Sequence, residues 1–484
     1  MTLFIIGLII LLGGGYFYSK YVESQLEPDD RETPAVKKAD GVDFVVMSKV
    51  KNWLINLLNI AGTGPILGPI QGILFGPIAF IAIPIGCVVA GAVHDFMTGF
   101  ISMRNGGSQV PKLVGKYLGG GVRGFYNIVI AVLLLLTGVV FVYTPGDLIA
   151  KFVLGKDPEG AVIWIIYAVI FAYYILSTVM PIDKVIGKIY PFFGAFLIIS
   201  AIGVLIGVLT KGNANLAFEG QGLLAEHPKG QRFIPAFFIT VACGILSGFH
   251  GSQVTLVSRT VKSEKEAKTT FYSTMIAEGF IAMIWAAGAI VLFSTGESAL
   301  DTPGTIMVGN ISKYFMGNIG GLMAIIGVIA LPITSGDTAF RSLRLIISEE
   351  MNIDQRKAGK RAGLAAVLFI PAAGILYFAK SNPNGFNVLW RYFGFTNQFV
   401  AIFALAVATV YLMYHNKNYF ITLIPGIFYC FIVFSFIINA DPIGFRQPYT
   451  IAYPIAAIIT VIYAVFVIRC GKKNRERIES IILD

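Results

Sequence analysis

Long apolar runs separated by short polar segments extend along almost the whole chain. A helix needs about 20 mostly apolar residues to cross the hydrocarbon core of a bilayer. About thirteen such runs are present; they cover residues 2–19, 52–75, 77–103, 124–146, 161–180, 188–210, 233–256, 270–294, 315–340, 362–379, 386–414, 419–438 and 450–468. The pattern predicts an all-α polytopic membrane protein with about thirteen transmembrane helices.

The composition agrees with this class and excludes others. Of 484 residues, 56% are apolar and 13% are charged, whereas soluble proteins carry about 25% charged residues. This balance excludes tandem soluble domains, a disordered chain and a secreted disulfide scaffold. The four cysteines lie far apart without CxxC spacing, and we expect small apolar core residues there. The net charge of +10 lies in short loops, so no nucleic-acid partner is expected.

The basic residues predict the orientation of the chain in the membrane. About three quarters of the 37 lysine and arginine residues fall in one alternate set of loops and in the C-terminal tail. Loops rich in lysine and arginine face the cytoplasm. The N-terminus is therefore expected outside and the C-terminus in the cytoplasm.

Two of the apolar runs contain residues that interrupt a helix. Run 52–75 holds Gly62, Gly64, Pro65, Gly68 and Pro69 within a few residues of each other. Run 233–256 contains the stretch 247–252, SGFHGS, near its middle. Proline removes a backbone donor and glycine weakens a helix. Unwound backbone at membrane depth is tolerated where it lines a cavity or is buried in protein, so both stretches are candidate binding regions.

The spacing of unusual residues predicts an internal repeat. The two breaks, the acids Asp95 and Glu278, and the prolines Pro145 and Pro332 are each separated by roughly 185 residues and five helices. An odd number of intervening helices gives the two halves opposite orientations, as in a five-plus-five inverted repeat. An alternative is that glycine and proline are simply common in membrane helices.

The repeat divides the chain into six parts. We expect a peripheral helix at 1–19, a cytoplasmic loop at 20–51, the first five-helix repeat at 52–210, an extracytoplasmic loop at 211–232, the second repeat at 233–414, and two peripheral helices with a basic cytoplasmic tail at 415–484.

Five sequence segments resemble the carbon starvation protein A family. They are AGTGPILGPIQG at 61–72, AGAVHDF at 90–96, SGFH at 247–250, TSGDTAFRSLR at 334–344 and LWRYFGFTNQ at 389–398. The resemblance implies an inner-membrane transporter of the amino acid–polyamine–cation superfamily that takes up peptides or pyruvate during nutrient limitation. His94 and Arg391 depart from the family pattern, in which we expect glutamine and proline, and this leaves the substrate open.

The broken helices supply the candidate substrate site. A half-helix that starts near Gly64 presents free backbone N–H groups, and such a terminus attracts anions. Ser252 and Gln253 are expected to cap the second half-helix, so that both breaks face one pocket. The candidate substrate-binding residues are Gly62, Thr63, Gly64, Gly68, Gly248, His250, Gly251, Ser252, Asn397 and Gln398. The alternatives are packing kinks, a histidine bonded to a backbone carbonyl, and amides that bond between helices.

Ionisable and hydroxyl groups at membrane depth supply the candidate coupling site. Asp95 and Glu278 lie within apolar runs, where an acid marks an ion pathway or a structural pair. The candidate coupling residues are His94, Asp95, Glu278, Thr334, Ser335 and Asp337. The superfamily often places a sodium ion near the hydroxyls, which otherwise bond to their own helix. Asp337 and Arg341 are spaced as an ordinary helix-surface ion pair. No metal site or cofactor is expected beyond a coupling proton or sodium ion.

These features predict a secondary active transporter that imports a small carboxylate or a short peptide by alternating access. The substrate classes are pyruvate, an amino acid or a dipeptide, and the partners are that small molecule and the lipid bilayer. An ion or solute channel and a membrane nutrient sensor are the alternative functions. A membrane-embedded enzyme is not expected, because the sequence contains no nucleophile–base pair and no metal-ligand spacing.

Overall fold

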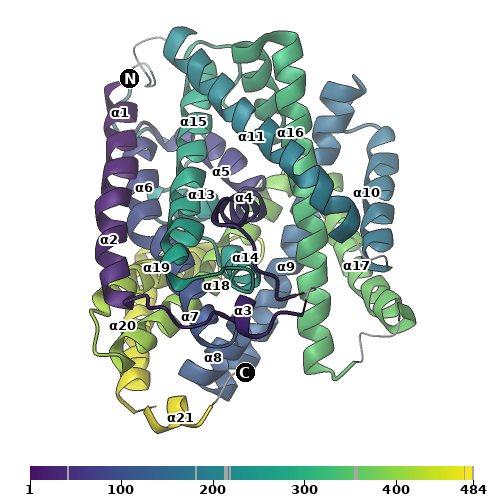
Figure 1. Ribbon diagram of the computed structural model, residues 1–484. Coiled ribbons are helices and arrows are strands. Elements are labelled where there is room, and N and C mark those ends of the chain that lie inside the picture. Colours follow the sequence, from purple (N-terminus) through teal and green to yellow (C-terminus); the bar gives the residue numbers. More distant parts are fainter. Residues whose placement is uncertain are drawn as a thin grey trace.

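The computed structural model consists of membrane-length helices around a centre of shorter, interrupted ones (Figure 1). It describes residues 1–40, 43–179, 183–211, 216, 218, 220–353, 358–473 and 475–481. Residue 180 of the predicted run 161–180 and residues 482–484 of the predicted tail lie outside the described residues. Apart from one isolated parallel bridge between Met47 and Val261, the regular structure of the described residues is helical.

The helices follow one another through short connections. In chain order they are α1 (Thr2–Ile9), α2 (Gly15–Leu26), α3 (Pro34–Lys37), α4 (Lys49–Ile60), α5 (Gly64–Gly72), α6 (Ala79–Gly86), α7 (Ala92–Arg104), α8 (Val110–Leu118), α9 (Gly120–Leu148), α10 (Val162–Val179), α11 (Asp183–Lys211), α12 (Phe233–Thr240), α13 (Ala242–Ile245), α14 (Gly248–Val257), α15 (Ser273–Ser294), α16 (Gly304–Glu350), α17 (Ala358–Ser381), α18 (Gly385–Tyr414), α19 (Phe420–Asn439), α20 (Tyr449–Lys473) and α21 (Arg475–Ser480). Short π-helical turns join α1 to α2 at Ile10–Gly14 and α6 to α7 at Cys87–Gly91.

The number of spans differs from the thirteen that the apolar runs predict. Ten described helices are long and apolar enough to cross a membrane, or eleven if α4 and α5 form one bent span. The run at 161–180 gives a shorter apolar helix, and the run at 233–256 is divided among α12, α13 and α14. The count of thirteen is therefore not confirmed, and the inverted repeat stays a prediction.

Both predicted breaks are present; the first half-helix starts at Gly64, near the expected residue, and the second starts earlier than expected. The chain bends by 51° between α4 and α5, and the unwound residues 61–63 precede Gly64. Pro65 stands in the first turn of α5, where a missing N–H costs no helical hydrogen bond. In the second break, Leu246 and Ser247 are extended and α14 begins at Gly248. His250 and Ser252 therefore lie within α14, not in unwound chain.

The broken helices are buried, whereas several intact ones carry an apolar outer surface. Helices α5 and α13 pack against each other and against α15, and α14 packs against α7 and α18. In Figure 1 these elements occupy the middle of the molecule, with α1 and α2 at one side and α10 and α17 at the other. Exposed large apolar side chains cover α1, α10, α17 and α20, including Ile9, Ile165, Ile370 and Ile458. Such an apolar surface is suited to contact with lipid.

Candidate functional site

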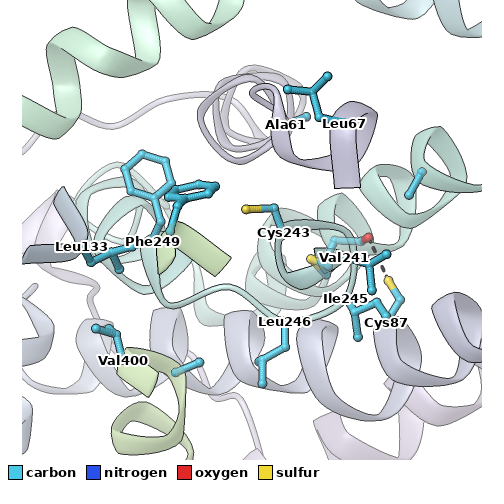
Figure 2. Packing of buried hydrophobic residues seen from close by; sticks show 14 of the residues in the cluster. Ala61, Leu67, Cys87, Leu133, Val241, Cys243, Ile245, Leu246, Phe249 and Val400 are labelled. Atoms are coloured by element: carbon cyan, nitrogen blue, oxygen red, sulfur yellow. Dashed lines mark hydrogen bonds between the residues drawn. The ribbon is translucent and has the colours of Figure 1, made fainter. Parts of the chain in front are cut away.

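The first break brings α5 into close contact with the second broken helix. A Cβ atom added to Gly64 would lie 2.1 Å from Cβ of Cys243 on α13, and one added to Gly68 would lie 2.9 Å from the carbonyl oxygen of Thr240. Figure 2 shows Cys243 beside the segment that carries Ala61 and Leu67. Only glycine permits such an approach of backbones. The first break thus packs against α13 and the end of α12, the helices that precede the second break.

Thr63 lies at the start of α5 and carries a polar group without a bond. Its carbonyl oxygen accepts hydrogen bonds from the N–H groups of Ile66 and Leu67, at 3.2 and 2.9 Å. Its hydroxyl is fully buried and has no hydrogen-bond partner among the described residues. A buried polar atom without a partner is uncommon in folded proteins and often marks the place of a ligand or water. Thr63 and the first turn of α5 can therefore receive a hydrogen-bonding group.

The second break is held by the amide of Asn397. Its Oδ1 accepts hydrogen bonds from Oγ of Ser247, at 2.7 Å, and from the N–H of Phe249, at 3.2 Å. This amide therefore caps α14, and the expected caps Ser252 and Gln253 do not: the Ser252 hydroxyl donates to the carbonyl of Phe249 instead. The same reason applies to both residues: α14 starts five residues earlier than a cap at Ser252 requires.

The remaining candidate substrate-binding residues of this region, Gln398 and three glycines, lie at contacts between helices. Nε2 of Gln398 donates to the carbonyl oxygen of Phe238 on α12, at 2.7 Å. A Cβ added to Gly248 would lie 2.5 Å from the carbonyl oxygen of Asn397, and one added to Gly251 would lie 3.6 Å from Cε1 of His94. A Cβ added to Gly62 would lie 2.9 Å from the ring of Phe141. The contacts of Gly248 and Gly251 place α14 close to α18 and α7, whereas Gln398 joins α18 to α12 and Gly62 packs against α9.

Two acids and two histidines form one buried chain of polar contacts. Nδ1 of His94 lies 2.8 Å from Oδ1 of Asp95. The other oxygen of Asp95 lies 3.1 Å from Nδ1 of His250. Nε2 of His250 lies 3.5 Å from Oε2 of Glu278. The chain crosses α7, α14 and α15, and its four side chains are at most 1% exposed. We call it the His–Asp–His–Glu chain.

The geometry restricts where protons can reside in this chain. Both oxygens of Asp95 face an imidazole Nδ1, so each ring satisfies the carboxylate by donating from that nitrogen. Nε2 of His250 then points at Glu278, whose two oxygens have no hydrogen-bond partner among the described residues. A proton placed between that nitrogen and the Glu278 carboxyl would satisfy both groups. No lysine or arginine lies within 4 Å of either acid in the part of the chain that the structure describes.

The other predicted coupling residues lie on α16 and show mainly the ordinary contacts considered for them. The Thr334 hydroxyl donates to the carbonyl of Leu331 on its own helix, at 2.8 Å. The Asp337 carboxylate accepts a hydrogen bond from Ser177 of α10 and lies 3.6 Å from the Arg341 guanidinium. The Ser335 hydroxyl is buried and has no hydrogen-bond partner among the described residues.

The structure also shows a cavity that the sequence analysis missed. It has a volume of about 620 Å³ and is lined by Tyr143 and Asp147 of α9, Glu159 of the following loop, Gln71 of α5, Thr240 of α12 and Arg391 of α18. We call it the vestibule. Its loops belong to the set that is poor in lysine and arginine, which is predicted to be extracytoplasmic. Asp147 directly follows the apolar run 124–146, and this position at the end of a membrane span is the signal in the sequence that could have indicated the cavity. Across the described residues, no group of three or more His, Cys, Asp or Glu side chains is arranged to hold a metal ion.

The sequence comparison identifies the family. A model described as "Carbon starvation protein CstA" matches residues 1–151, 129–317 and 306–435. The chain belongs to the carbon starvation protein CstA family. The resemblance inferred from the five segments is confirmed.

Relatives within the family include named transporters. The chain is 39% identical to an uncharacterised membrane protein of Haemophilus influenzae, over 62% of this chain and 94% of that protein. It is 26% identical to the peptide transporter CstA of Campylobacter jejuni, over 87% of this chain and 77% of the relative. It is also 26% identical to the pyruvate/proton symporter BtsT of Escherichia coli K12, over 80% of this chain and 63% of the relative.

A solved transporter structure has a similar fold. The manganese transporter of Eremococcus coleocola superposes with a TM-score of 0.56 over 91% of this chain and 99% of its own, at 12% identity. At this identity the likeness concerns the fold alone. Together with the apolar helices, these comparisons support a multi-pass membrane transporter.

Proposed function

We propose that this family member is a secondary active transporter that imports a small carboxylate or a short peptide and is driven by a proton gradient. The relatives named as a peptide transporter and a pyruvate/proton symporter support the substrate class and the coupling ion. The observation that carries the proposal is the His–Asp–His–Glu chain. It places groups that bind and release protons at the contact between a broken helix and two intact helices.

The chemistry of the His–Asp–His–Glu chain favours a proton over a sodium ion at this position. A sodium ion needs several oxygen atoms around it, whereas both oxygens of Asp95 face imidazole nitrogens. Two buried carboxylates without a lysine or arginine within 4 Å among the described residues are costly to keep fully ionised. A proton held between His250 and Glu278 removes part of that buried charge. The chain can therefore take up a proton in one state of the transporter and release it in another.

The position of His250 connects this proton to a movement. His250 lies in the first turn of α14, immediately after the extended residues Leu246 and Ser247. Asp95 and Glu278 lie on the unbroken helices α7 and α15. A rotation of α14 about the break would separate the imidazole from both acids. The presence of a proton thus favours one orientation of α14, which is the physical requirement for coupling.

The start of α5 is the proposed site for the substrate carboxylate. The N–H groups of Ile66 and Leu67 already donate to the Thr63 carbonyl, and Pro65 has no N–H, so the attraction of this terminus for an anion comes from the dipole of α5. The unbonded hydroxyl of Thr63 adds a donor at the same place. Gly64 contacts Cys243 of α13, and Cys243 is three residues before the extended residues Leu246 and Ser247 that precede α14. Binding at α5 and proton binding at α14 are therefore close enough to influence each other through direct packing.

The proposal is tested by uptake into proteoliposomes that contain the purified protein. With an alkaline interior, we expect labelled pyruvate or labelled dialanine to accumulate above its outside concentration, to saturate, and to show counterflow. A protonophore should abolish accumulation, and a sodium gradient alone should not drive it. Flux that neither saturates nor shows counterflow would indicate a channel. Accumulation driven by sodium alone would contradict proton coupling.

A further inference from the structure

Lys380 is a buried cation behind the wall of the vestibule, in contact with the lining residues Tyr143, Asp147 and Glu159. It lies in the last turn of α17, and its side chain is 2% exposed. Its Nζ lies 2.9 Å from Oδ1 of Asp147, 2.8 Å from Oε1 of Glu159 and 3.4 Å from the hydroxyl of Tyr143. An ammonium group has three donors, so these three contacts satisfy it. The second oxygen of Asp147 accepts from the Thr305 hydroxyl, at 3.1 Å.

The two acids that bind Lys380 differ in their surroundings. The Asp147 side chain is 7% exposed and belongs to the long helix α9. The Glu159 side chain is 68% exposed and belongs to the loop between α9 and α10. A carboxylate on an exposed loop can leave its partner and enter water at little cost. Asp147 is therefore the fixed partner of Lys380, and Glu159 is the exchangeable one.

We propose that Lys380 is the first binding site for the carboxylate of the incoming substrate, and that Glu159 occupies this site until the substrate displaces it. The ligand class rests on the proposed function, an imported carboxylate or peptide. One carboxylate replaces another on the same ammonium group. The buried charge and the number of hydrogen bonds at Lys380 are unchanged by the exchange, so the substrate meets no desolvation cost beyond its own.

The vestibule leads from this cation towards the broken helices. Its wall includes Gln71, three residues after Gly68 on α5, and Thr240 at the end of α12. The Thr240 carbonyl accepts a hydrogen bond from the indole of Trp390, at 3.1 Å, and is adjacent to Gly68. The amide nitrogen of Gln71 is buried and has no hydrogen-bond partner among the described residues. A substrate carboxylate that moves from Lys380 towards the broken helices can therefore accept a hydrogen bond from the Gln71 amide, on the same half-helix that carries Gly64.

The test compares two variants that each remove one negative charge from the vestibule. Glu159→Gln weakens the bond to Lys380, because a neutral amide is a poorer acceptor for an ammonium group. Asp157→Asn is the matched control, because Asp157 is exposed, lines the same cavity and accepts from the backbone N–H of Glu159. Half-saturation by outside pyruvate is measured in right-side-out vesicles, together with inhibition by the neutral analogue pyruvamide. Dialanine and its amide replace these probes if dialanine is the substrate transported.

We expect Glu159→Gln to lower the half-saturation concentration for pyruvate by about threefold or more, because the variant removes a competitor that keeps part of the protein from binding. Asp157→Asn should change it less than about twofold, and inhibition by pyruvamide should be unchanged in both. The proposal would be overturned if Glu159→Gln and Asp157→Asn changed the half-saturation concentration for pyruvate equally. It would also be overturned if Glu159→Gln changed the half-saturation by pyruvate and the inhibition by pyruvamide equally. Wild-type protein that shows no gradient-driven uptake would instead contradict the proposed function.

A second variant pair separates binding from folding. Lys380→Met alone leaves Asp147 buried without its cation, which is strongly destabilising. The double variant Lys380→Met, Asp147→Asn removes both charges together. In that background, Glu159→Gln should have no further effect on half-saturation by pyruvate. A persisting threefold decrease would show that Glu159 acts without Lys380 and would overturn the proposal.

Discussion

The imidazole of His250 and the carboxylate of Asp95 lie 3.1 Å apart across the contact between α14 and α7. Residues 155 positions apart in the sequence thus share a proton-binding pair inside the protein. Because α14 starts two residues before His250, this pair joins a helix next to a break to the unbroken helix α7. In the mechanism proposed above, this contact makes the orientation of the half-helix sensitive to protonation.

The Asn397 cap should be important for stability. Asn397→Ala removes the acceptor for both Ser247 and the N–H of Phe249, and loss of a helix cap costs about 1 kcal/mol, up to about 2. Ser247→Ala removes one of these bonds and leaves the backbone bond in place. We expect a lower melting temperature in detergent for Asn397→Ala than for Ser247→Ala. A smaller decrease in melting temperature for Asn397→Ala than for Ser247→Ala would show that the Asn397 amide does not stabilise the start of α14.

The contact between the two broken helices predicts a compensating pair of substitutions. Gly64→Ala should lower stability by about 1–3 kcal/mol, because its Cβ would overlap Cβ of Cys243. Cys243→Gly removes that atom, and the double variant should recover part of the stability and of the uptake of pyruvate. Gly374→Ala is the control, since a Cβ there meets no atom within 4 Å. If Cys243→Gly restores neither the stability nor the uptake of pyruvate in the Gly64→Ala background, the contact with Cys243 does not explain the need for glycine at position 64.

Local sequence signals predicted the broken helices and the buried acids, because proline, glycine and charge stand out within apolar runs. The start of α5 near Gly64 and Pro65 follows from the preference of proline for the first turn of a helix. The start of α14 was predicted less well, because its cap comes from Asn397 on another helix and not from Ser252 or Gln253. The contact of His250 with Glu278 could not be predicted, because it depends on how α14 approaches α15. Lys380 was counted only among loop cations, since nothing in its own segment indicates the acids of α9 and its loop.

The predicted orientation can be tested by single-cysteine labelling in intact cells. The native cysteines, Cys87, Cys243, Cys430 and Cys470, are at most 7% exposed, so their background labelling should be low. Cysteines introduced at the exposed positions Glu226 and Asp301 should react with an impermeant reagent from outside, and one at Lys265 should not. Outside labelling at Lys265 would reverse the assignment. Lys357, another predicted cytoplasmic position, lies outside the described residues.

The vestibule loop should show a pH dependence that originates at His227. Burial, together with Lys229 and Arg391, lowers the pKa of His227 to about 4 from 6.5. Its Nδ1 accepts the backbone N–H of Lys229, at 3.1 Å, as a neutral ring can. The unfolded chain therefore binds this proton more tightly, and the stability that the neutral ring contributes is present above about pH 6.5 and is lost as the pH falls towards about 4.

We expect the melting temperature of the wild type to decrease between about pH 7 and about pH 4.5. His227→Asn retains an acceptor without an ionisable group, and its melting temperature should decrease less over the same range. Identical pH dependence in the two proteins would exclude His227 as the origin.

The central claim is that Asp95 and Glu278 couple transport to protons. The direct measurement is the accumulation and the counterflow of labelled pyruvate in proteoliposomes with an imposed pH gradient, for the wild type, Asp95→Asn and Glu278→Gln, with Asp301→Asn as an exposed control. Both amide variants preserve the shape of the side chain and remove the titratable group; the NH2 that replaces one oxygen is a donor, which a facing histidine can accept in its other tautomer. We predict that both lose gradient-driven accumulation and retain counterflow, and that the control retains both. Accumulation that survives in Asp95→Asn and in Glu278→Gln would contradict the account and would move the coupling site towards Thr334, Ser335 and Asp337.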